Sequence, residues 1–442
     1  MRPRVHVIHV GNMSNKGTQA LLISDIRMIR EILGDPYISV STTDVRGVEN
    51  LGLHLNAVLP PLVDIPYERT DKWAKTFHYG RNSPRYKALS FAMLFCMLFQ
   101  FMLSVGSVFV VKLGLKSPYR NEVLDHLSDC DLVVSHSDES FKETASQLPL
   151  NPFWAVTWWS MLVSRTYEML AAKSFRRPVV LFPNSVGPFR TFVGRLLARL
   201  SLNSCSCILI RDSISYGIVE KLGVRPQIAR ILTYDTALLF QTNHRKTNVH
   251  FSQPVLGVCP GFYSLSLSKP EAQKYVIAHA SALDEVVERH GFSIVFLPHY
   301  VSGFENDDLE ISRSIMSKMK HKDRLQLVNA ETVEEFKSLL EQTDMIISSK
   351  MHPAVLGVSG FVPVLCIAYD HKQTSFFERL GMKDCVVDIR QISQKKLAST
   401  IDYVWNQRER LKEDLRKEIP SWQKHVRKTI QLAISTYLGT GS

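Results

Sequence analysis

The sequence predicts an α/β protein with two doubly wound domains that face each other across a cleft. Short runs rich in Val and Ile alternate with amphipathic helical stretches, which is the pattern of parallel sheets covered by helices. The chain has 442 residues, more than one domain usually holds. The alternation also restarts after a polar stretch at residues 242–250, where we place the domain boundary.

The first domain is expected to cover residues 1–245. Its strands are predicted where apolar and β-branched residues run together between turn-forming residues. These runs are Val5–Val10, Ile38–Thr42, Leu132–His136, Val179–Pro183, Cys207–Arg211 and Ile231–Tyr234. Helices with apolar residues three and four positions apart are predicted between them, at Gly17–Leu33, Thr157–Ser174, Val193–Leu202 and Ser213–Leu222.

The second domain is expected to cover residues 246–442 and repeats the same pattern. Its strands are predicted at Val255–Cys259, Ser293–Leu297, Leu325–Asn329, Met345–Ser348 and Val362–Ala368. Its helices are predicted at Lys269–His290, Asp307–Lys320, Thr332–Gln342 and His352–Ser359. The basic helices from Gln391 onward either stay on this domain or cross back over the first.

The first domain carries an apolar insert at about residues 86–113. Ala88–Val111 contains no charged residue, and Arg85, Lys87, Lys112 and Lys116 flank it. Its length suffices to cross a membrane, but a span would put parts of one fold on opposite sides of the bilayer. Three interpretations stay open: a buried or groove-covering helix, an anchor at the membrane surface, and a transmembrane span.

Composition and charge narrow the class of protein. Hydrophobic residues make up 45% of the chain and charged residues 21%, which excludes a mostly disordered or fibrous protein. The net charge of +11 suits phosphate-bearing substrates, nucleic acid or an anionic membrane surface. Basic residues are dispersed without interleaved aromatic residues, so we expect no nucleic-acid partner. Seven irregularly spaced cysteines indicate a reducing compartment and no metal site.

The sharpest chemical pattern follows the predicted strand Met345–Ser348. Lys350 and His352 lie two residues apart, so an extended loop would project both side chains to one side. A cation beside an imidazole forms an anion site with a proton donor. The strand Val362–Ala368 ends similarly, with Tyr369 and Lys372. Because parallel strands end at one edge of a sheet, these side chains are expected to meet.

Other candidate residues also follow predicted strands. Arg211 ends a buried strand and can fork onto a phosphate or carboxylate, whereas the adjacent Asp212 is expected to cap a helix. The loop from Gly11 to Gly17 leads into a helix N-terminus, which can bind an anion or a substrate. The remaining candidates in these loops and strand ends are Asn12, Asn15, Ser185, Asp235 and His299.

Together these segments resemble the polysaccharide pyruvyl transferase family. The matching segments, in chain order, are Gly11…Asn15-Lys-Gly17, Pro183-Asn-Ser-Val-Gly-Pro188, Ile210-Arg-Asp-Ser-Ile-Ser215, Asp235, Pro298-His299, Ser348-Ser-Lys-Met-His352 and Tyr369-Asp-His-Lys372. Where the family usually has Gly-x-Arg-x-His, this chain has Ser348 and Lys350, and the usual Gly-Gly pair reads Ser135-His-Ser137. Residues 60–125 have no clear family counterpart.

The resemblance implies a GT-B-like pair of Rossmann-type domains. It implies transfer of a pyruvyl group from phosphoenolpyruvate to sugar hydroxyls of a polysaccharide or lipid-linked oligosaccharide, forming a ketal. His352 would be the catalytic acid. The donor would bind to Arg211, Lys350, Lys372, His299 and Tyr369, and the acceptor or its loops to Asn12, Asn15, Gly17, Ser185 and Asp235. This scheme needs no metal and no cofactor besides phosphoenolpyruvate as co-substrate.

The partners expected from this resemblance are phosphoenolpyruvate and a carbohydrate acceptor, with membrane-surface contact through residues 88–111 if these form an anchor. The expected location is the cytoplasm, or the inner face of the plasma membrane in the anchored case. Two alternatives remain: a GT-B-type glycosyltransferase with a nucleotide-sugar donor, and a membrane-surface binding protein. Against the first, no ribose-binding carboxylate stands out, since Glu305 and Glu310 resemble surface charges.

Overall fold

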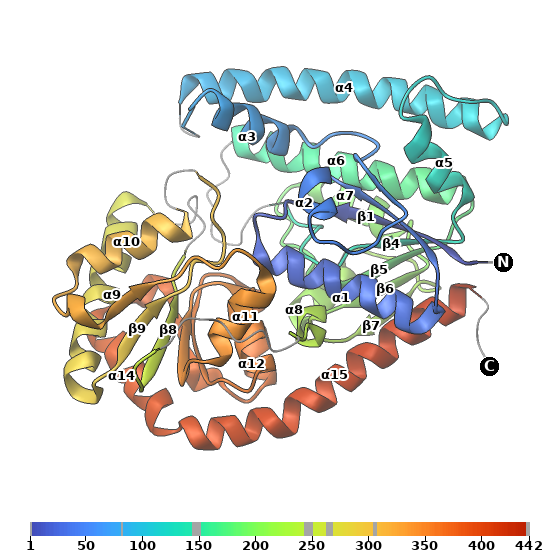
Figure 1. The fold of residues 1–442 in the computed structure, drawn as a ribbon. Coiled ribbons are helices and arrows are strands. Elements are labelled where there is room, and N and C mark those ends of the chain that lie inside the picture. Colours follow the sequence, from blue (N-terminus) through green and yellow to red (C-terminus); the bar gives the residue numbers. More distant parts are fainter. Residues whose placement is uncertain are drawn as a thin grey trace.

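The computed structural model describes residues 2–80, 83–143, 152–242, 251–261, 268–303 and 307–438. It contains two parallel sheets with helices packed on them, which confirms the predicted α/β class (Figure 1). The expected domain boundary at 242–250 lies almost entirely outside the described residues. It therefore stays a prediction.

The first sheet has the strand order β3-β2-β1-β4-β5-β6-β7. Its strands are β1 (Arg4–Val10), β2 (Tyr37–Thr42), β3 (Ala57–Leu59), β4 (Leu132–Ser135), β5 (Val179–Asn184), β6 (Cys207–Ile210) and β7 (Ala229–Leu232). The sequence did not indicate β3. The order reverses direction between β1 and β4, and such a switch point leaves a crevice at the carboxyl ends of the strands.

Two apolar cores hold helices against this sheet. The helices are α1 (Lys16–Leu33), α2 (Val45–Glu49), α3 (Pro66–Thr76), α4 (Pro84–Lys112), α5 (Asn121–Asp129), α6 (Pro152–Ser174), α7 (Phe192–Leu202) and α8 (Ser213–Lys221), with a 3-10 turn η1 (Thr236–Leu239). Leu22 and Ile26 of α1 belong to one core, whereas Leu124 of α5, Leu162 of α6 and Leu202 of α7 belong to the other.

The second sheet has the order β10-β9-β8-β11-β12-β13. Its strands are β8 (Val255–Cys259), β9 (Ser293–Phe296), β10 (Leu325–Leu327), β11 (Met345–Ser348), β12 (Val364–Ala368) and β13 (Val386–Asp388). The helices are α9 (Lys269–His290), α10 (Asp308–Lys318), α11 (Val333–Glu341), α12 (Met351–Ser359), α13 (His371–Arg379) and α14 (Gln394–Asn406), with 3-10 turns η2 (Lys322–Arg324), η3 (Lys383–Cys385) and η4 (Ile389–Gln391). Its switch point lies between β8 and β11.

A long last helix, α15 (Arg408–Leu438), joins the two domains. It runs along the second domain and on to the first, as Figure 1 shows in red. Trp422 belongs to the apolar core of the second domain, whereas Val426 and Ile430 belong to a core of the first. Trp422 also stacks on Tyr234 at 4.0 Å between ring centroids. These contacts stabilise the relative position of the two sheets.

The apolar insert forms α4, which lies along the outer side of the first domain (Figure 1). Among the described residues it is the one helix long and apolar enough to cross a membrane, by length and composition only. Just four of its residues are buried, namely Tyr86, Met97, Ser104 and Ser107. The helix is therefore not buried in a core, but one side of it packs on the first domain, so the alternative of a helix that covers the domain stays open.

Candidate functional site

The carboxyl ends of the two sheets meet at the N-terminus of α1. Asn15 forms a β-bridge with Tyr300, and the Lys16 ammonium lies 3.4 Å from the carbonyl oxygen of Pro298. The backbone N–H of Gly17 donates to Asn15 Oδ1 and to His299 Nε2, both at 2.9 Å. The loop after β1 is thus seated on the loop after β9, and residues from both domains surround one region.

His352 lies against this junction. Lys350 is the residue before α12 and His352 is in the first turn of that helix, so the expectation of one extended loop carrying both is wrong. The imidazole packs directly on Gly17, where a Cβ atom would come within 2.1 Å of His352 Nδ1. Any other residue at position 17 would displace the ring. Glycine is required there for close packing.

The His352 ring is buried, and one of its nitrogens has no partner. Its side chain is 8% exposed, and Nε2 forms no hydrogen bond within the described part of the chain. Burial lowers the pKa of His352; the carboxylate of Asp235 opposes this shift and the guanidinium of Arg211 adds to it. The imidazole is therefore neutral at pH 7 in the ligand-free protein.

His299 lies beside His352, with 6.2 Å between the ring centroids. Because its Nε2 accepts from the Gly17 N–H, the proton of the neutral ring is on Nδ1. Burial, together with His352 and Lys350, holds the pKa of His299 well below its usual value. His299 is thus a neutral acceptor that positions the start of α1.

Arg211, at the carboxyl end of β6, is a buried cation with one donor group unused. Its Nε donates to Ser185 Oγ and its Nη1 to Asp235 Oδ2, each at 2.8 Å. Its Nη2 has no hydrogen-bond partner among the described residues. Burial alone would disfavour the charged form, but the Asp235 carboxylate raises the pKa of Arg211.

Neighbouring groups hold Arg211 in this orientation. Ser185 Oγ donates in turn to Asp212, which caps α8 as expected by accepting from the N–H of Ser215. Arg379 of the second domain donates to the carbonyl oxygens of Arg211 and Thr233 at 3.0 and 2.8 Å. Residues of the first domain therefore fix the guanidinium of Arg211, and Arg379 of the second domain bonds its backbone.

Lys350 and Lys372 are each paired with a carboxylate. The Lys350 ammonium lies 3.3 Å from Asp308 Oδ1, whereas Lys372 pairs with Glu139 of the first domain. Burial opposes both charges, yet Asp308 raises the pKa of Lys350 and Glu139 raises that of Lys372. Both lysines are therefore charged at neutral pH.

The aromatic candidate Tyr369 lies at the end of β12, half-buried between these groups. Burial raises the pKa of its phenol, while the charge of Lys350 opposes the rise. Tyr369 is thus a neutral hydroxyl near the ammonium group of Lys350. It fits a role in orienting a ligand rather than in transferring a proton at neutral pH.

A cavity with a volume of about 990 Å³ lies on the first domain. Asn12, Asn15, Asp138 and Tyr300 line its side toward the junction. Charged side chains of the loop after β3 and of α3 line the rest, among them Asp64, Glu68, Arg69, Lys72 and Lys75. The candidate site residues therefore lie in two places. The donor candidates gather at the junction, whereas Asn12 and Asn15 line this cavity.

Three charged groups near the candidate residues were not indicated by the sequence. Asp308 and Glu139 pair with the two lysines, and Arg165 is 8% exposed with an Nε that has no partner in the described ranges. Their local sequences resemble those of surface charges and of an ordinary amphipathic helix. His136, in the stretch that replaces the usual Gly-Gly pair, is fully buried and pairs with Asp25 at 2.8 Å.

Comparison with known proteins supports the resemblance. The sequence profile described as polysaccharide pyruvyl transferase matches residues 19–371, which include Arg211, Lys350 and His352 but end just before Lys372. AmsJ of Erwinia amylovora, an amylovoran biosynthesis protein, is 21% identical over 267 residues. The aligned part is 57% of this chain and 63% of AmsJ, less than two thirds of that relative.

Solved structures with similar folds include UDP-N-acetylglucosamine 2-epimerases and a glycosyltransferase. A protein of Listeria monocytogenes described as a UDP-N-acetylglucosamine 2-epimerase has a TM-score of 0.58 at 12% identity, over 100% of this chain and 98% of that one. A Rickettsia africae glycosyltransferase has a TM-score of 0.55 at 12% identity, with both chains fully covered. Identities this low show the fold alone. The fold is GT-B-like, and the chain belongs to the polysaccharide pyruvyl transferase family.

Proposed function

We propose that this protein transfers a pyruvyl group from phosphoenolpyruvate to two hydroxyls of a carbohydrate, forming a ketal. Family membership supports the general kind of reaction. The observation that carries the finer proposal is a set of buried atoms at the junction with no hydrogen-bond partner in the described part of the chain: Arg211 Nη2, His352 Nε2 and His299 Nδ1. Buried polar atoms without partners are rare in proteins, and a ligand that accepts a hydrogen bond from Arg211 would account for the one at Arg211.

The charges at the junction suit a small compact anion. Phosphoenolpyruvate carries a phosphate and a carboxylate, and Arg211, Lys350 and Lys372 offer three cations. Each is paired with one carboxylate in the ligand-free protein, so the donor must share or displace Asp308 and Glu139. Arg211 can bind the donor through Nη2 without breaking its contacts to Asp235 and Ser185.

The proposed reaction begins with proton transfer. Protonated His352 gives its proton to the methylene carbon of the donor, which makes C2 electrophilic. The first hydroxyl oxygen bonds to C2 and its proton returns to His352. The bond between C2 and the phosphate oxygen then breaks, and the second hydroxyl closes the ketal while its proton leaves with phosphate. The fixed charges of Arg211, Lys350 and Lys372 stabilise the phosphate as it separates.

The lowered pKa of His352 fits this scheme only if donor binding changes it. Burial keeps the ring neutral in the free protein. A bound donor brings several negative charges next to the ring, and nearby opposite charge favours the imidazolium. Proton uptake by His352 would then accompany donor binding. His352 would then be protonated, and able to act as the acid, only when the donor is bound.

The acceptor in this proposal is a polysaccharide or a lipid-linked oligosaccharide held by the first domain. The cavity lined by Asn12 and Asn15 is large enough for sugar residues and is rich in hydrogen-bonding groups. It adjoins the junction through Asp138 and Tyr300. The scheme uses no metal and no further cofactor, and both remain predictions.

Calorimetric titration tests the donor directly. The protein should bind phosphoenolpyruvate with proton uptake near pH 7, which is seen as a dependence of the measured enthalpy on the buffer. A UDP-sugar should not compete with it. Binding of the UDP-sugar but not of phosphoenolpyruvate would contradict the proposal and favour a glycosyltransferase.

A further inference from the structure

Helix α4 has two apolar sides, and one of them packs on the first domain. Leu94, Met97, Phe101 and Val108, spaced three, four and seven residues apart, contact the apolar core beneath. Gln100 also donates to Asp64 Oδ2 at 2.8 Å. This side attaches α4 to the protein along its length.

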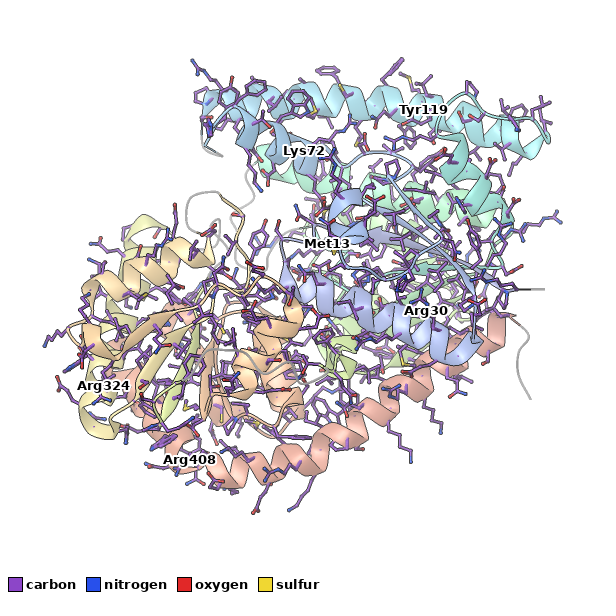
Figure 2. All side chains as sticks on the ribbon, viewed as in Figure 1. Met13, Arg30, Lys72, Tyr119, Arg324 and Arg408 are labelled. Carbon is purple, nitrogen blue, oxygen red and sulfur yellow. The ribbon has the colours of Figure 1, made fainter. Side chains whose placement is uncertain are left out.

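The opposite side is apolar but has no protein partner among the described residues. Phe95, Phe99, Met102 and Phe109 are 71%, 59%, 64% and 64% exposed. Their spacing of four, three and seven residues places them on one side of the helix. Figure 2 shows side chains of α4 projecting beyond the rest of the first domain. We call these four residues the outer face.

The other long helix, α15, shows what an exposed side normally looks like. Its buried positions, such as Leu411, Leu415 and Ile419, also recur every four residues. Glu413 and Lys417, between them, are exposed and charged. Water solvates such a side well, so it needs no partner. The outer face of α4 differs, because a contiguous exposed apolar surface marks an interaction site.

The charges at the ends of α4 indicate the partner. Arg85 and Lys87 are exposed at its start, and Lys112 and Lys116 at its end, with no charge between. An apolar strip between cations matches a bilayer that contains anionic phospholipids, since the strip enters the acyl boundary while the cations meet the headgroups. We propose that α4 lies flat in the surface of such a bilayer.

The packing of α4 on the domain decides between lying flat and spanning. Met97 and Phe101 contact the core beneath, so α4 cannot cross the bilayer without separating from that core. The outer face, which is exposed, can enter lipid while the other side stays packed. When the protein binds a bilayer, α4 therefore lies shallowly in the plane of the membrane surface.

This placement gives the proposed function a substrate class. Asp64, bonded to Gln100 of α4 and to Arg120, lines the 990 Å³ cavity, as do Arg69 and Lys72 of α3. The cavity wall is thus bonded directly to α4, the proposed membrane helix. If the proposed function holds, the acceptor is a carbohydrate on a membrane lipid. The membrane contact itself does not depend on that function.

Vesicle co-sedimentation of the full-length protein tests the contact without any substrate. The probes are phosphatidylcholine vesicles with and without phosphatidylglycerol. Binding should be strong only with phosphatidylglycerol. The combined variant Phe95→Gln, Phe99→Gln, Met102→Gln and Phe109→Gln should lower the affinity at least about tenfold, because it removes the apolar area that enters lipid. Its melting temperature and phosphoenolpyruvate binding should equal those of the parent.

A matched control changes four exposed apolar residues elsewhere: Phe192→Gln, Leu196→Gln, Leu200→Gln and Leu432→Gln. This variant should bind vesicles like the parent. An equal loss in both variants, or parental binding by the outer-face variant, overturns the proposal. So does a lipid-free dimer, seen by light scattering, that dissociates only in the outer-face variant, since the outer face would then bind a second copy.

Cys96 offers a test of depth, because it is exposed in the middle of α4. An environment-sensitive fluorophore on this thiol should be quenched by lipids brominated near the headgroup. Stronger quenching by lipids brominated near the chain ends would show a spanning helix and contradict the in-plane placement. The other described cysteines are buried, so labelling is selective.

Discussion

The junction between the domains and the outer face of α4 each lack a binding partner, but of opposite chemistry. The junction has buried polar atoms, whereas the outer face has exposed apolar side chains. At the junction, buried cations are already paired with carboxylates, and three polar atoms, Arg211 Nη2, His352 Nε2 and His299 Nδ1, have no hydrogen-bond partner among the described residues. On α4, large apolar side chains such as Phe95 and Met102 are exposed to water. The first calls for a small anion and the second for an apolar surface. The two ligands should therefore bind independently.

The largest expected effect comes from His352→Gln, which removes the proposed acid. Turnover should fall about 10³-fold, as general acid catalysis usually contributes 10²–10⁴-fold. Vesicle binding should be unchanged, which keeps the two regions separate. Turnover is measured as phosphate release in the presence of acceptor.

The matched control is His279→Gln, a buried histidine on α9 outside the junction. It should keep nearly full turnover. If both variants lose turnover equally, the effect reflects the loss of any buried imidazole, and His352 is not the acid.

The next effect is expected from Arg211→Lys. Lysine keeps the charge but loses the guanidinium fork, so the free donor group at Nη2 disappears. Donor affinity measured by calorimetry should fall about 10- to 100-fold, the value of a charge-assisted hydrogen bond. Arg427→Lys, in an exposed pair with Glu31, is the control and should change nothing. Parental affinity in Arg211→Lys would remove Arg211 from the donor site.

Two variants that should change donor affinity in opposite directions test the role of Lys372. Both changes should be smaller than that in Arg211→Lys. Lys372→Met should weaken donor binding about tenfold, because it removes one cation from the site. Glu139→Gln should instead strengthen it a few-fold, since the carboxylate no longer competes for Lys372. Weakening in both variants would mean that the pair holds the domains together and does not bind the donor.

The smallest expected effect is a difference between the pH dependence of kcat/KM and that of kcat. The acid must be protonated, so kcat/KM should fall as pH rises, with a midpoint below the usual 6.5 of histidine because burial lowers the pKa of His352. The fall in kcat should come at higher pH, since bound donor favours the imidazolium. Vesicle binding should not follow either curve. Coincident curves would contradict coupling of donor binding to protonation.

The sequence predicted the parts of the site that depend on single strands. Runs such as Cys207–Arg211 and Met345–Ser348 are apolar and short, so the polar residues after them fall at the carboxyl edge of a sheet. The structure brings Arg211, Lys350 and His352 near one another, as that reasoning expected, and their roles stay predictions. The same reasoning could not find Asp308 or Glu139 as partners, because those pairings depend on how loops and domains meet.

For the apolar insert, too, the sequence predicted the element but not its contacts with the rest of the fold. Apolarity and length predicted one helix at about residues 86–113, and α4 spans Pro84–Lys112. Composition could not tell which side packs on the domain, because both sides are apolar. Only the contacts of Met97 and Phe101 distinguish the buried side from the outer face. The short strands β3 and β13 were missed, whereas β10, equally short, was predicted within the run Leu325–Asn329.

Mass spectrometry of an acceptor panel tests the central claim most directly. The protein is incubated with phosphoenolpyruvate and either free polysaccharides or lipid-linked oligosaccharides. We predict that one acceptor gains the mass of pyruvate less water, with one phosphate released per transfer, and that His352→Gln gives neither. Sugar transfer from a nucleotide sugar to the same panel, with no reaction of phosphoenolpyruvate, would contradict the account.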